Sequence, residues 1–391
     1  MTGLLSGVRI LELSRILAGP WAGQVLADMG AEVIKVENPN GGDDTRTWGP
    51  PFVTDLDGNA IGDLSAYFLC ANRGKKSVCI DFTKPEGQEI VRKLAASCDV
   101  VIENFKVGGL KKYGLDYDSL KAVNPKLVYA SITGFGQDGP YAHRAGYDFM
   151  IQGLGGLMSL TGQPDGEPVK VGVALTDVLT GLYTAIGVLS ALHHARATGQ
   201  GHYVDIALLD VQVATLANQA LNYLVAGKAP KRLGNSHPNI VPYQAFPTLD
   251  GHIILAVGND GQFARFCAVA GHPEWAEDER FATNPSRVAH RALLVPMVAD
   301  ALSARSSRDW LTALEAVGVP AGPINDIAQV FADPQVVARG LKVDKILADG
   351  TVLPGVGTPI CVDGRRMVAE GAPPRLGAQS EDILEELLTR Q

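Results

Sequence analysis

The sequence predicts an α/β protein, with a large domain built on an open, Rossmann-like parallel sheet and a smaller α+β domain. The first observation is that short apolar runs alternate with segments of helical spacing from Val8 to Ile132, a pattern typical of parallel sheets covered by helices. The second is size, because 391 residues with 46% hydrophobic content can bury two cores. The third is a polar loop, Gly227 to Pro242, after which the composition changes.

The chain opens with a β-α-β unit. Val8 to Leu13 is a short apolar run, Pro20 to Met29 has helical spacing, and Ala31 to Val36 is a second strand. The loop from Ser14 to Pro20 follows a strand end, where parallel sheets bind ligands, so we expect it to line a site. It contains neither the G-x-G-x-x-G dinucleotide fingerprint nor a P-loop.

Strands and helices continue to alternate beyond this unit. Asn38 to Gly62 is rich in Gly, Pro and Asp and is expected to be a long surface loop, either functional or disordered. Thr83 to Glu86 has the pattern of a capping box that opens a helix. We expect strands at Ser77 to Phe82, Val100 to Glu103, Leu127 to Ile132 and His202 to Leu208, and helices at Thr83 to Ala96, near Gly109 to Val123 and at Asp210 to Val225.

A second, smaller unit is expected from Tyr243 to about Ile324. It would contain the strand Ile253 to Val257, several helices and a turn at Gly318 to Pro323. Strands and turns at Arg339 to Val362 and a helix at Glu381 to Leu388 would close the chain. The predicted boundaries are 1–225 for the large domain, 226–330 for the small domain and 331–345 for a linker.

Charge and cysteine usage exclude several classes of partner and site. The net charge of −8 and the lack of Lys/Arg clusters argue against nucleic acid or an anionic membrane, because both need a basic surface. Five widely spaced cysteines without a C-x-x-C pair indicate neither a disulfide framework nor a zinc site. With no targeting signal at the N-terminus, we expect a cytoplasmic protein. The longest uncharged runs, Val178 to Leu192 and Val211 to Gly227, are too short or too polar to span a bilayer.

Asp177 opens the most clearly patterned helix of the chain. Apolar residues then recur at three- and four-residue spacing until Gly199 supplies a stop, at Leu179, Leu182, Tyr183, Ile186, Leu189 and Leu192. At or next to the N-cap, the Asp177 carboxylate could simply satisfy the first N–H groups, which is worth roughly 1 kcal/mol. Because a helix N-terminus also holds a carboxylate ionised, Asp177 could instead be a nucleophile in covalent catalysis. The helix pattern leaves both interpretations open.

Several short segments occur in a fixed order along the chain. They are LELSRILAGP (Leu11 to Pro20), GAEVIKVE (Gly30 to Glu37), ENF (Glu103 to Phe105), GFG (Gly134 to Gly136), GYD (Gly146 to Asp148) and the Asp177 helix closing in TGQG (Thr198 to Gly201). With these segments the chain resembles the class III CoA-transferases, the CaiB/BaiF family, over essentially its full length. The resemblance matches Asp177 to the family's catalytic aspartate and therefore favours the nucleophile.

The same resemblance implies roles for other residues. Tyr147 and Asp148 match a tyrosine-acid pair that lines the catalytic site. The candidate CoA-binding positions are Ile16 and Ala18, along the pantetheine arm, and Asn38, Ile80, Lys84, Asn104, Phe105, Lys112 and Arg144. Lys112 would suit a CoA phosphate because that role needs a cation, whereas Lys84 and Arg144 are each displaced by one residue from the family's basic positions. No metal and no cofactor beyond the CoA thioester substrate are implied.

Departures from the family pattern reduce the number of candidate substrates and reactions. Formyl-CoA transferases carry glutamine at the Leu17 position, arginine at the Asn38 position and a longer glycine-rich flap than Gly234 to Pro238, so formate and oxalate are poor candidates. Acyl-CoA racemases of the superfamily place a histidine at the Tyr147 position. Tyrosine, with a reference pKa of about 10, is too weak a base to replace it easily, so an isomerase is a weaker alternative.

Three further segments look most like the branch of the family that transfers CoA from succinyl-CoA to dicarboxylates such as glutarate. They are Gly42 to Phe52, Ile240 to Phe246 and Gly258 to Phe263. A dicarboxylate keeps one carboxylate free, which a cation should hold. The sequence does not rank the candidates for substrate binding, which are the cations Arg15, Arg46, Arg232 and His237 together with Leu17 and Gly234.

The resemblance also implies a mechanism and an assembly. Asp177 would attack an acyl-CoA and carry CoA as an aspartyl thioester to a carboxylic acid, and N–H groups of the Asp177 helix and the Gly234 loop could stabilise the oxyanion. Family members form interlocked, ring-like homodimers in which about residues 345–391 would complete the large domain. A catalytically silent CoA-binding subunit is a second alternative, against which Tyr147, Asp148 and Asp177 argue.

Overall fold

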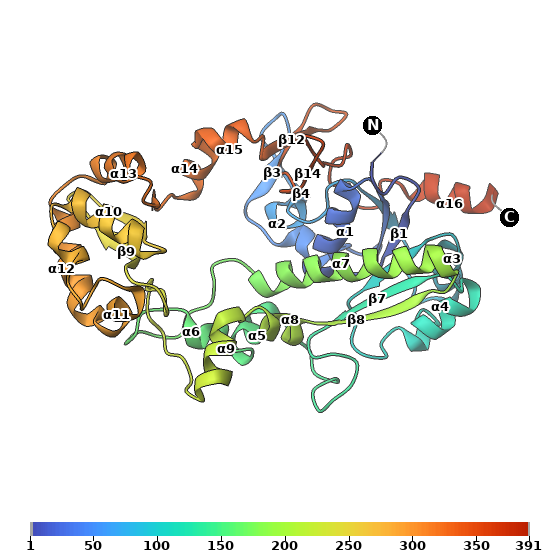
Figure 1. Cartoon of the computed structure of the whole chain (residues 1–391). Coiled ribbons are helices and arrows are strands. Elements are labelled where there is room, and N and C mark those ends of the chain that lie inside the picture. Colours follow the sequence, from blue (N-terminus) through green and yellow to red (C-terminus); the bar gives the residue numbers. More distant parts are fainter. Residues whose placement is uncertain (1–2, 390–391) are drawn as a thin grey trace. The chain divides into compact units, whose positions relative to one another are not determined.

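Six parallel strands form the central sheet in the order β5-β2-β1-β6-β7-β8 (Figure 1). In chain order they are β1 (Arg9–Glu12), β2 (Glu32–Glu37), β5 (Lys75–Cys79), β6 (Val100–Glu103), β7 (Val128–Thr133) and β8 (His202–Ala207). Renumbered among themselves, these strands follow the doubly wound order 3-2-1-4-5-6, whose direction reverses between β1 and β6. The predicted α/β class with an open parallel sheet is confirmed, and the loops after β1 and β6 are placed where such sheets bind ligands.

The structure, a computed structural model, describes residues 3–389 and separates the chain into two units. Of the described residues, the first unit comprises 3–157, 171–221 and 334–389, and the second comprises 158–170 and 222–333. The predicted boundaries differ from this division in several places. Residues 158–170 and 222–225, expected in the large domain, belong to the second unit, and the expected linker 331–345 is divided between the second unit up to residue 333 and the first unit from residue 334.

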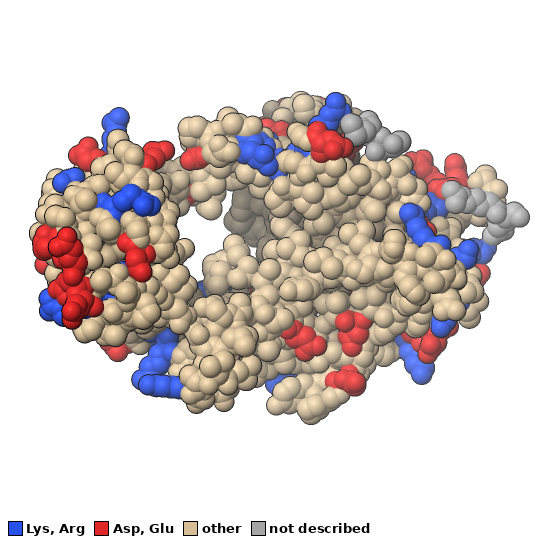
Figure 2. All heavy atoms as spheres, viewed as in Figure 1, with Lys and Arg blue, Asp and Glu red and all other residues tan. Residues whose placement is uncertain are grey.

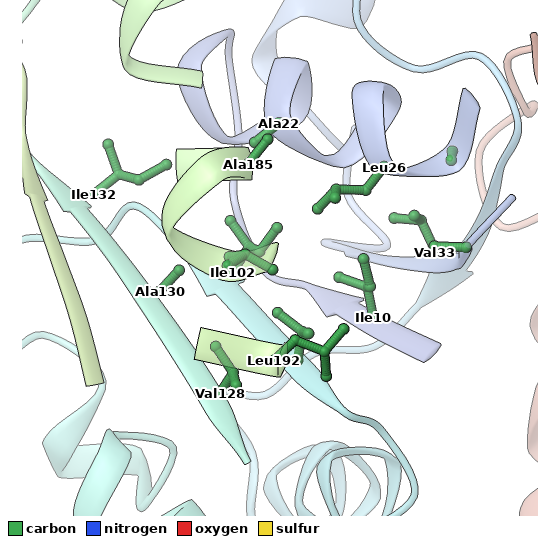
Figure 3. Close-up of a cluster of buried hydrophobic side chains, with 14 of the residues drawn as sticks. Ile10, Ala22, Leu26, Val33, Ile102, Val128, Ala130, Ile132, Ala185 and Leu192 are labelled. Carbon is green, nitrogen blue, oxygen red and sulfur yellow. The ribbon is translucent and has the colours of Figure 1, made fainter. Parts of the chain in front are cut away.

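Two hydrophobic cores cover opposite faces of the central sheet. Ile10 of β1 belongs to one and its neighbour Leu11 to the other, because successive strand residues point to opposite faces. Figure 3 shows the first core, in which Ala22 and Leu26 of α1 (Ala18–Asp28) and Ala185 and Leu192 of α7 (Leu175–Thr198) lie over the sheet. The second core is closed by α3 (Pro85–Ala96), α4 (Tyr117–Val123) and α16 (Ser380–Thr389).

The other elements of the first unit are short. They are η1 (Asp44–Thr47), β3 (Phe52–Thr54), β4 (Ala60–Ser65), α2 (Ala66–Leu69), η2 (Lys111–Tyr113), α5 (Asp148–Leu154), α8 (Leu208–Ala214), α15 (Pro334–Ala338), β12 (Lys342–Ile346), β13 (Val352–Val356), β14 (Cys361–Val362) and β15 (Arg365–Arg366). Two further helices, α6 (Leu157–Leu160) and α9 (Ala217–Ala226), run from one unit into the other.

The second unit has its own antiparallel sheet, ordered β11-β10-β9, and its own core around Phe246, Ile253 and Trp310. Its elements are β9 (Tyr243–Pro247), β10 (His252–Ala256), α10 (Asp260–Ala270), η3 (Pro273–Ala276), α11 (Asn284–Ala289), α12 (Arg291–Ser303), α13 (Ser307–Ala316), β11 (Ala321–Pro323) and α14 (Ile327–Ala332). The antiparallel sheet with helices agrees with the α+β domain that the sequence predicts.

Local predictions failed where tertiary contacts intervene. Asn38 to Gly62 is mostly exposed as expected, but it is not a plain loop, because it contains η1 and β3 and buries Asp43, Thr45 and Arg46. The helix expected at Asp210 to Val225 is two helices, separated near Ala217, whose φ is +48°. The capping box is absent: Thr83 Oγ1 donates to Asp81 at 2.6 Å, and the N-cap of α3 is Lys84.

Helix α7 differs from its sequence-based description in two respects. Of the six apolar residues at three- and four-residue spacing only Leu192 is buried, and Leu182, Tyr183, Ile186 and Leu189 are 37–59% exposed, so α7 does not bury the stripe that the spacing predicts. Within the described residues it is long and apolar enough to cross a membrane by length and composition, although the uncharged run alone is too short. In the structure α7 packs against α1, β7 and β8, and Ala185, Val188 and Leu192 lie in the first core. It is therefore a core helix of the α/β unit, and Gly199 ends it in a left-handed conformation as predicted.

Candidate active site

Asp177 lies in the first turn of α7, two residues inside the helix. The N-cap residue is Ala174, whose side chain makes no capping hydrogen bond. The backbone N–H of Asp177 donates to Oδ2 of Asp148 at 3.2 Å. The capping interpretation is thus wrong for the Asp177 side chain, since the neighbouring Asp148 satisfies a first-turn N–H group instead.

Asp148 is held in place by a glutamine one turn along α5. Gln152 is fully buried; its Nε2 donates to Asp148 Oδ1 at 2.6 Å, and its Oε1 accepts from the N–H of Val171 at 2.9 Å. On the other side of Asp177, Thr176 Oγ1 donates to Gln212 Oε1 at 2.7 Å. The buried Gln152 therefore restrains the side chain of Asp148, and the buried Gln212 restrains Thr176, the neighbour of Asp177.

The pKa of Asp177 is shifted far from the ordinary aspartate value. Burial, and secondarily the negative charge of Asp148, raise the pKa of Asp177 to about 7. The helix N-terminus favours the ionised form of Asp177, but burial and the Asp148 charge raise its pKa above the ordinary aspartate value. A carboxylate with a pKa near neutrality is a stronger nucleophile than an ordinary aspartate and is still substantially ionised at physiological pH.

Tyr67, which the sequence did not single out, belongs to the same region. Burial, and then the negative charge of Asp177, raise the pKa of this phenol to about 12, with a smaller contribution from Asp148. Its ring makes an edge contact with Trp48, at 5.2 Å between centroids. Tyr147 is the N-cap residue of α5 and is 63% exposed. With a pKa of about 12, the Tyr67 phenol stays protonated at neutral pH and keeps its hydroxyl as a hydrogen-bond donor.

The loop after β1 is hydrogen-bonded to the loop after β6. Asn104 uses both ends of its amide on the backbone of Arg15: Oδ1 accepts from the N–H at 2.9 Å, and Nδ2 donates to the carbonyl at 2.7 Å. The loop then enters α1, which packs tightly on α7. A Cβ on Gly181 would lie 2.7 Å from the Ala18 carbonyl oxygen. Because Gly181 is one turn past Asp177, the loop of Arg15 lies next to the candidate nucleophile.

The other candidate CoA-binding residues differ in burial and in their contacts. Phe105 packs edge-on to Phe82 at 5.8 Å, and Ile80 is buried. The Lys112 ammonium lies 4.6 Å from the ring centre of Tyr113. The remaining positions are Lys84, exposed and paired with Asp81 at 3.5 Å, Arg144, over the rings of Phe135 and Tyr141, and Asn38, which accepts from the Asn40 N–H at 2.8 Å. Leu17 and Ala18 are buried at the start of α1.

Arg46 is excluded as the cation that holds a substrate carboxylate. Its guanidinium is fully buried, pairs with both oxygens of Glu37 at 2.6 and 2.8 Å, and donates to the Pro374 carbonyl. Arg15 is half exposed and pairs with Asp44 at 2.8 Å. Because Arg15 lies in the loop beside α1 and α7, it is the candidate in the first unit for binding the free carboxylate of the substrate.

The other substrate candidates lie in the second unit. Arg232 donates to the carbonyls of Gln163 and Gly166, at 3.2 and 2.8 Å. The N–H of Gly234 donates to the Gly162 carbonyl at 3.0 Å. Burial and the charge of Arg291 lower the pKa of His237, which favours its neutral form. Local contacts therefore engage the guanidinium of Arg232, and His237 is a weak source of positive charge.

Residues 3–389 contain no group of three or more His, Cys, Asp and Glu side chains that could hold a metal ion. The reactive groups brought together are Asp177, Asp148 and Tyr67, with Gln152 behind them. Gln152 stands four residues after Asp148, a spacing that would have suggested this contact had α5 been predicted. Tyr67 has no such signal, because it comes from a distant part of the sequence.

Comparisons with known proteins show the family to which the chain belongs. Residues 5–380 match the family model of CoA-transferase family III. A succinate–glutarate CoA-transferase of Agrobacterium fabrum is 57% identical over 98% of this chain and 96% of its own length, and the human succinyl-CoA:glutarate CoA-transferase is 43% identical over 98% and 86%. The crystal structure of a CAIB/BAIF family protein from Brucella suis superposes with a TM-score of 0.87, at 54% identity over 99% of this chain and all of that one.

Proposed function

The chain belongs to CoA-transferase family III, and from that premise we propose that it moves CoA from succinyl-CoA to a dicarboxylate such as glutarate through a covalent intermediate on Asp177. The observation that carries the proposal is the Asp177–Asp148 pair at the start of α7, where the pKa of Asp177 is raised to about 7 by burial and by Asp148. The names of the similar proteins from Agrobacterium fabrum and human support the pair of substrates.

The exchange needs no external energy, because the acyl activation is conserved at each step. An Asp177 oxygen attacks the thioester carbon of succinyl-CoA, the C–S bond breaks, and CoA thiolate leaves behind a mixed anhydride. The thiolate attacks the Asp177 side-chain carbonyl, which releases succinate and forms an aspartyl-CoA thioester. The acceptor carboxylate then attacks this thioester, and the thiolate returns to the acceptor's carbonyl. The product is a new acyl-CoA and free Asp177.

Other groups of the site have supporting roles in this scheme. The Tyr67 hydroxyl is suited to stabilise the oxyanion of each tetrahedral intermediate, whereas the N–H groups of Leu175 and Asp177 already donate to Val173 and Asp148. Asp148, held by Gln152 at 2.6 Å, keeps the first turn in place through the N–H of Asp177. We assign the free carboxylate of the dicarboxylate to Arg15, because Arg46 is buried against Glu37.

The covalent step can be tested by intact-protein mass spectrometry. Wild-type protein is mixed with succinyl-CoA and trapped with hydroxylamine, and the modified residue is mapped; acceptor acids are then scanned by the acyl-CoA they form. We expect the adduct on Asp177 and glutaryl-CoA formation only when glutarate is added. Asp177→Asn should abolish both signals, while Asp205→Asn, which changes another partly buried carboxyl, should retain them. Transfer by Asp177→Asn at the wild-type rate would refute the mechanism.

An acyl-CoA isomerase is the alternative within the superfamily. It predicts deuterium exchange at the α-carbon of an acyl-CoA without any acceptor acid. Tyr147, the residue at the position of the racemase base, is exposed and has no basic partner among its described contacts. Exchange without an acceptor, and no glutaryl-CoA with one, would favour the isomerase.

We further propose that the protein is a cytoplasmic homodimer. Large apolar side chains are exposed on α5, among them Phe149 at 58%, and on α7, among them Ile186 at 59%. Figure 2 shows that the surface along α7 is almost free of Lys, Arg, Asp and Glu. Apolar patches of this kind are typical of protein interfaces, and the family resemblance makes a second copy of the chain the expected partner. All five cysteines of the chain are free thiols, and free thiols suit the reducing conditions of the cytoplasm.

A further inference from the structure

Ile16, directly after the β1 loop residue Arg15, has a left-handed backbone with φ of +71°. Among residues 3–389 the other non-glycine residues with positive φ are Ala217 and Asp363. A β-branched side chain rarely adopts this conformation, and a residue stays in it only where its surroundings impose it. The surroundings of Ile16 must therefore supply a specific restraint.

Asp43 provides that restraint. Both of its carboxylate oxygens lie 3.2 Å from the backbone nitrogen of Ile16 and accept its N–H. Asp43 is itself almost fully buried, and it accepts from the N–H and the hydroxyl of Thr45 at 3.0 and 2.8 Å. Although burial opposes ionisation, the charge of Lys35 lowers the pKa of Asp43 to about 2. The carboxylate is thus charged throughout the neutral range.

Lys35 links the restraint to the centre of the sheet. Its ammonium, fully buried, lies 2.9 Å from Asp43 and 3.0 Å from Glu12 of β1, and it donates to the Ser14 carbonyl at 2.8 Å. Glu12 also pairs with the buried Lys75 at 2.8 Å. One lysine thus holds both ends of the turn, Ser14 directly and Ile16 through Asp43.

The turn held in this way leads to the reacting groups. It continues into Leu17 and Ala18, and the Ala18 carbonyl packs on Gly181 of α7, one turn past Asp177. Ile16 itself is only partly buried, so its side chain is available to a ligand. A change at Ile16 would therefore alter the wall of the site beside Asp177.

We propose that Asp43 is a positioning residue for the acyl-CoA: it stabilises the left-handed Ile16 and so fixes the Ser14 to Ala18 turn against which the acyl-CoA packs beside Asp177. Asp43 does not touch the reacting atoms in this scheme. The proposal rests on the proposed function, since it assumes that acyl-CoA binds next to Asp177. The proposal gives the buried Asp43–Lys35 pair a role, which is to hold the backbone of the loop between Ser14 and Ala18.

A double-mutant cycle between Asp43 and Ile16 tests the proposal. Glycine adopts positive φ without strain, so a Gly at position 16 needs no restraint. We expect Asp43→Asn to weaken CoA binding about 10-fold in the Ile16 background but less than about threefold in the Ile16→Gly background. Binding is measured by calorimetry with CoA on the full-length protein, and KM for succinyl-CoA should rise in parallel with little change in kcat. Equal losses in both backgrounds would overturn the proposal.

Asp28 provides a matched control. It is a buried aspartate of the same unit that pairs with Arg73 at 2.7 Å and accepts the N–H of Ala369 at 2.9 Å. Asp28→Asn should lower the Tm without changing KM for succinyl-CoA. If Asp43→Asn does not fold, the cycle is repeated with Asp43→Glu, which retains the partner of Lys35 but displaces the carboxylate. A wild-type protein that fails to bind CoA would refute the proposed function rather than the role of Asp43.

Discussion

The backbone N–H of Asp177 donates a hydrogen bond to Oδ2 of Asp148 at 3.2 Å, so two acidic residues share the start of one helix. This arrangement has two effects. It satisfies a first-turn donor of α7 with a neighbouring side chain, and it places a second negative charge near the nucleophile. Together with burial, that charge raises the pKa of Asp177 to about 7.

The rate should depend on pH through this shifted pKa. Only ionised Asp177 attacks a thioester, so kcat/KM for succinyl-CoA should be flat above about pH 7 and fall about tenfold per unit below it. Asp148→Asn removes the charge contribution and should move the acidic limb to lower pH, although burial remains. Asp205→Asn is the control, because the Asp205 carboxyl also has a raised pKa but lies on β8. An unchanged limb in Asp148→Asn would mean that the Asp148 charge does not contribute to the raised pKa of Asp177.

Gln152 should matter for catalysis beyond its contribution to stability. Gln152→Leu removes the hydrogen bond to Asp148 and the acceptor of the Val171 N–H, so we expect kcat to fall roughly 10- to 100-fold and stability to fall by about 1–3 kcal/mol. Gln24→Leu is matched, because buried Gln24 also bonds two backbone groups, the Cys70 carbonyl and the Arg73 N–H. Urea unfolding should show similar losses in both variants, and kinetics should separate them. A normal kcat in Gln152→Leu would refute its positioning role.

The close packing of α1 on α7 requires glycine at position 181. In Gly181→Ala the new methyl group would lie 2.7 Å from the Ala18 carbonyl oxygen and 2.9 Å from Trp21 Cβ, so we expect a loss of about 1–3 kcal/mol and a raised KM for succinyl-CoA. Gly261→Ala, in helix α10, meets nothing closer than 3.5 Å and should be neutral or stabilising by up to about 1 kcal/mol. Thermal unfolding of the two variants makes the comparison. Equal stability would argue against the close approach of the two helices at Gly181.

Arg15 should determine the preference for dicarboxylates. Removal of its charge in Arg15→Met is expected to lower kcat/KM for glutarate about 10- to 100-fold, the scale of a charge-assisted hydrogen bond, while the smaller rate with pentanoate stays the same. Arg92→Met is the control, since Arg92 forms a comparable exposed pair with Glu89 on α3. The rates of both acids are measured in competition by mass spectrometry of the acyl-CoA products. A parallel loss for both acids would assign Arg15 to CoA or to the fold instead.

The exposed apolar surface of α7 should be buried in the dimer. Ile186→Glu introduces a charge where we expect the second copy, so it should shift the molar mass in light scattering from dimer to monomer. Leu388→Glu changes an even more exposed leucine on α16, at 72%, and should leave the mass unaltered. A wild-type protein that is monomeric at micromolar concentration would contradict the assembly.

Sequence patterns predict some residues of the candidate site and miss others. Asp177 and Asp148 were identified because the family motifs are contiguous and Asp177 begins a clearly periodic helix. Gln152 was missed because the glycine-rich segment around it concealed α5. Tyr67 and Asp43 were missed because each meets the site only through residues distant in sequence, Asp177 and Ile16 respectively.

By itself the sequence determined the alternation of strands and helices, the helix of Asp177 and the family, because these depend on local periodicity and on contiguous motifs. Only the tertiary structure decided the roles of the charged residues between Asn38 and Gly62. Arg46 belongs to a polar segment that predicts exposure, yet it is buried because it pairs with Glu37 and donates to the carbonyl of Pro374, far along the chain. A buried charge is tolerated only where such partners meet it, and no local pattern records a partner more than 300 residues away.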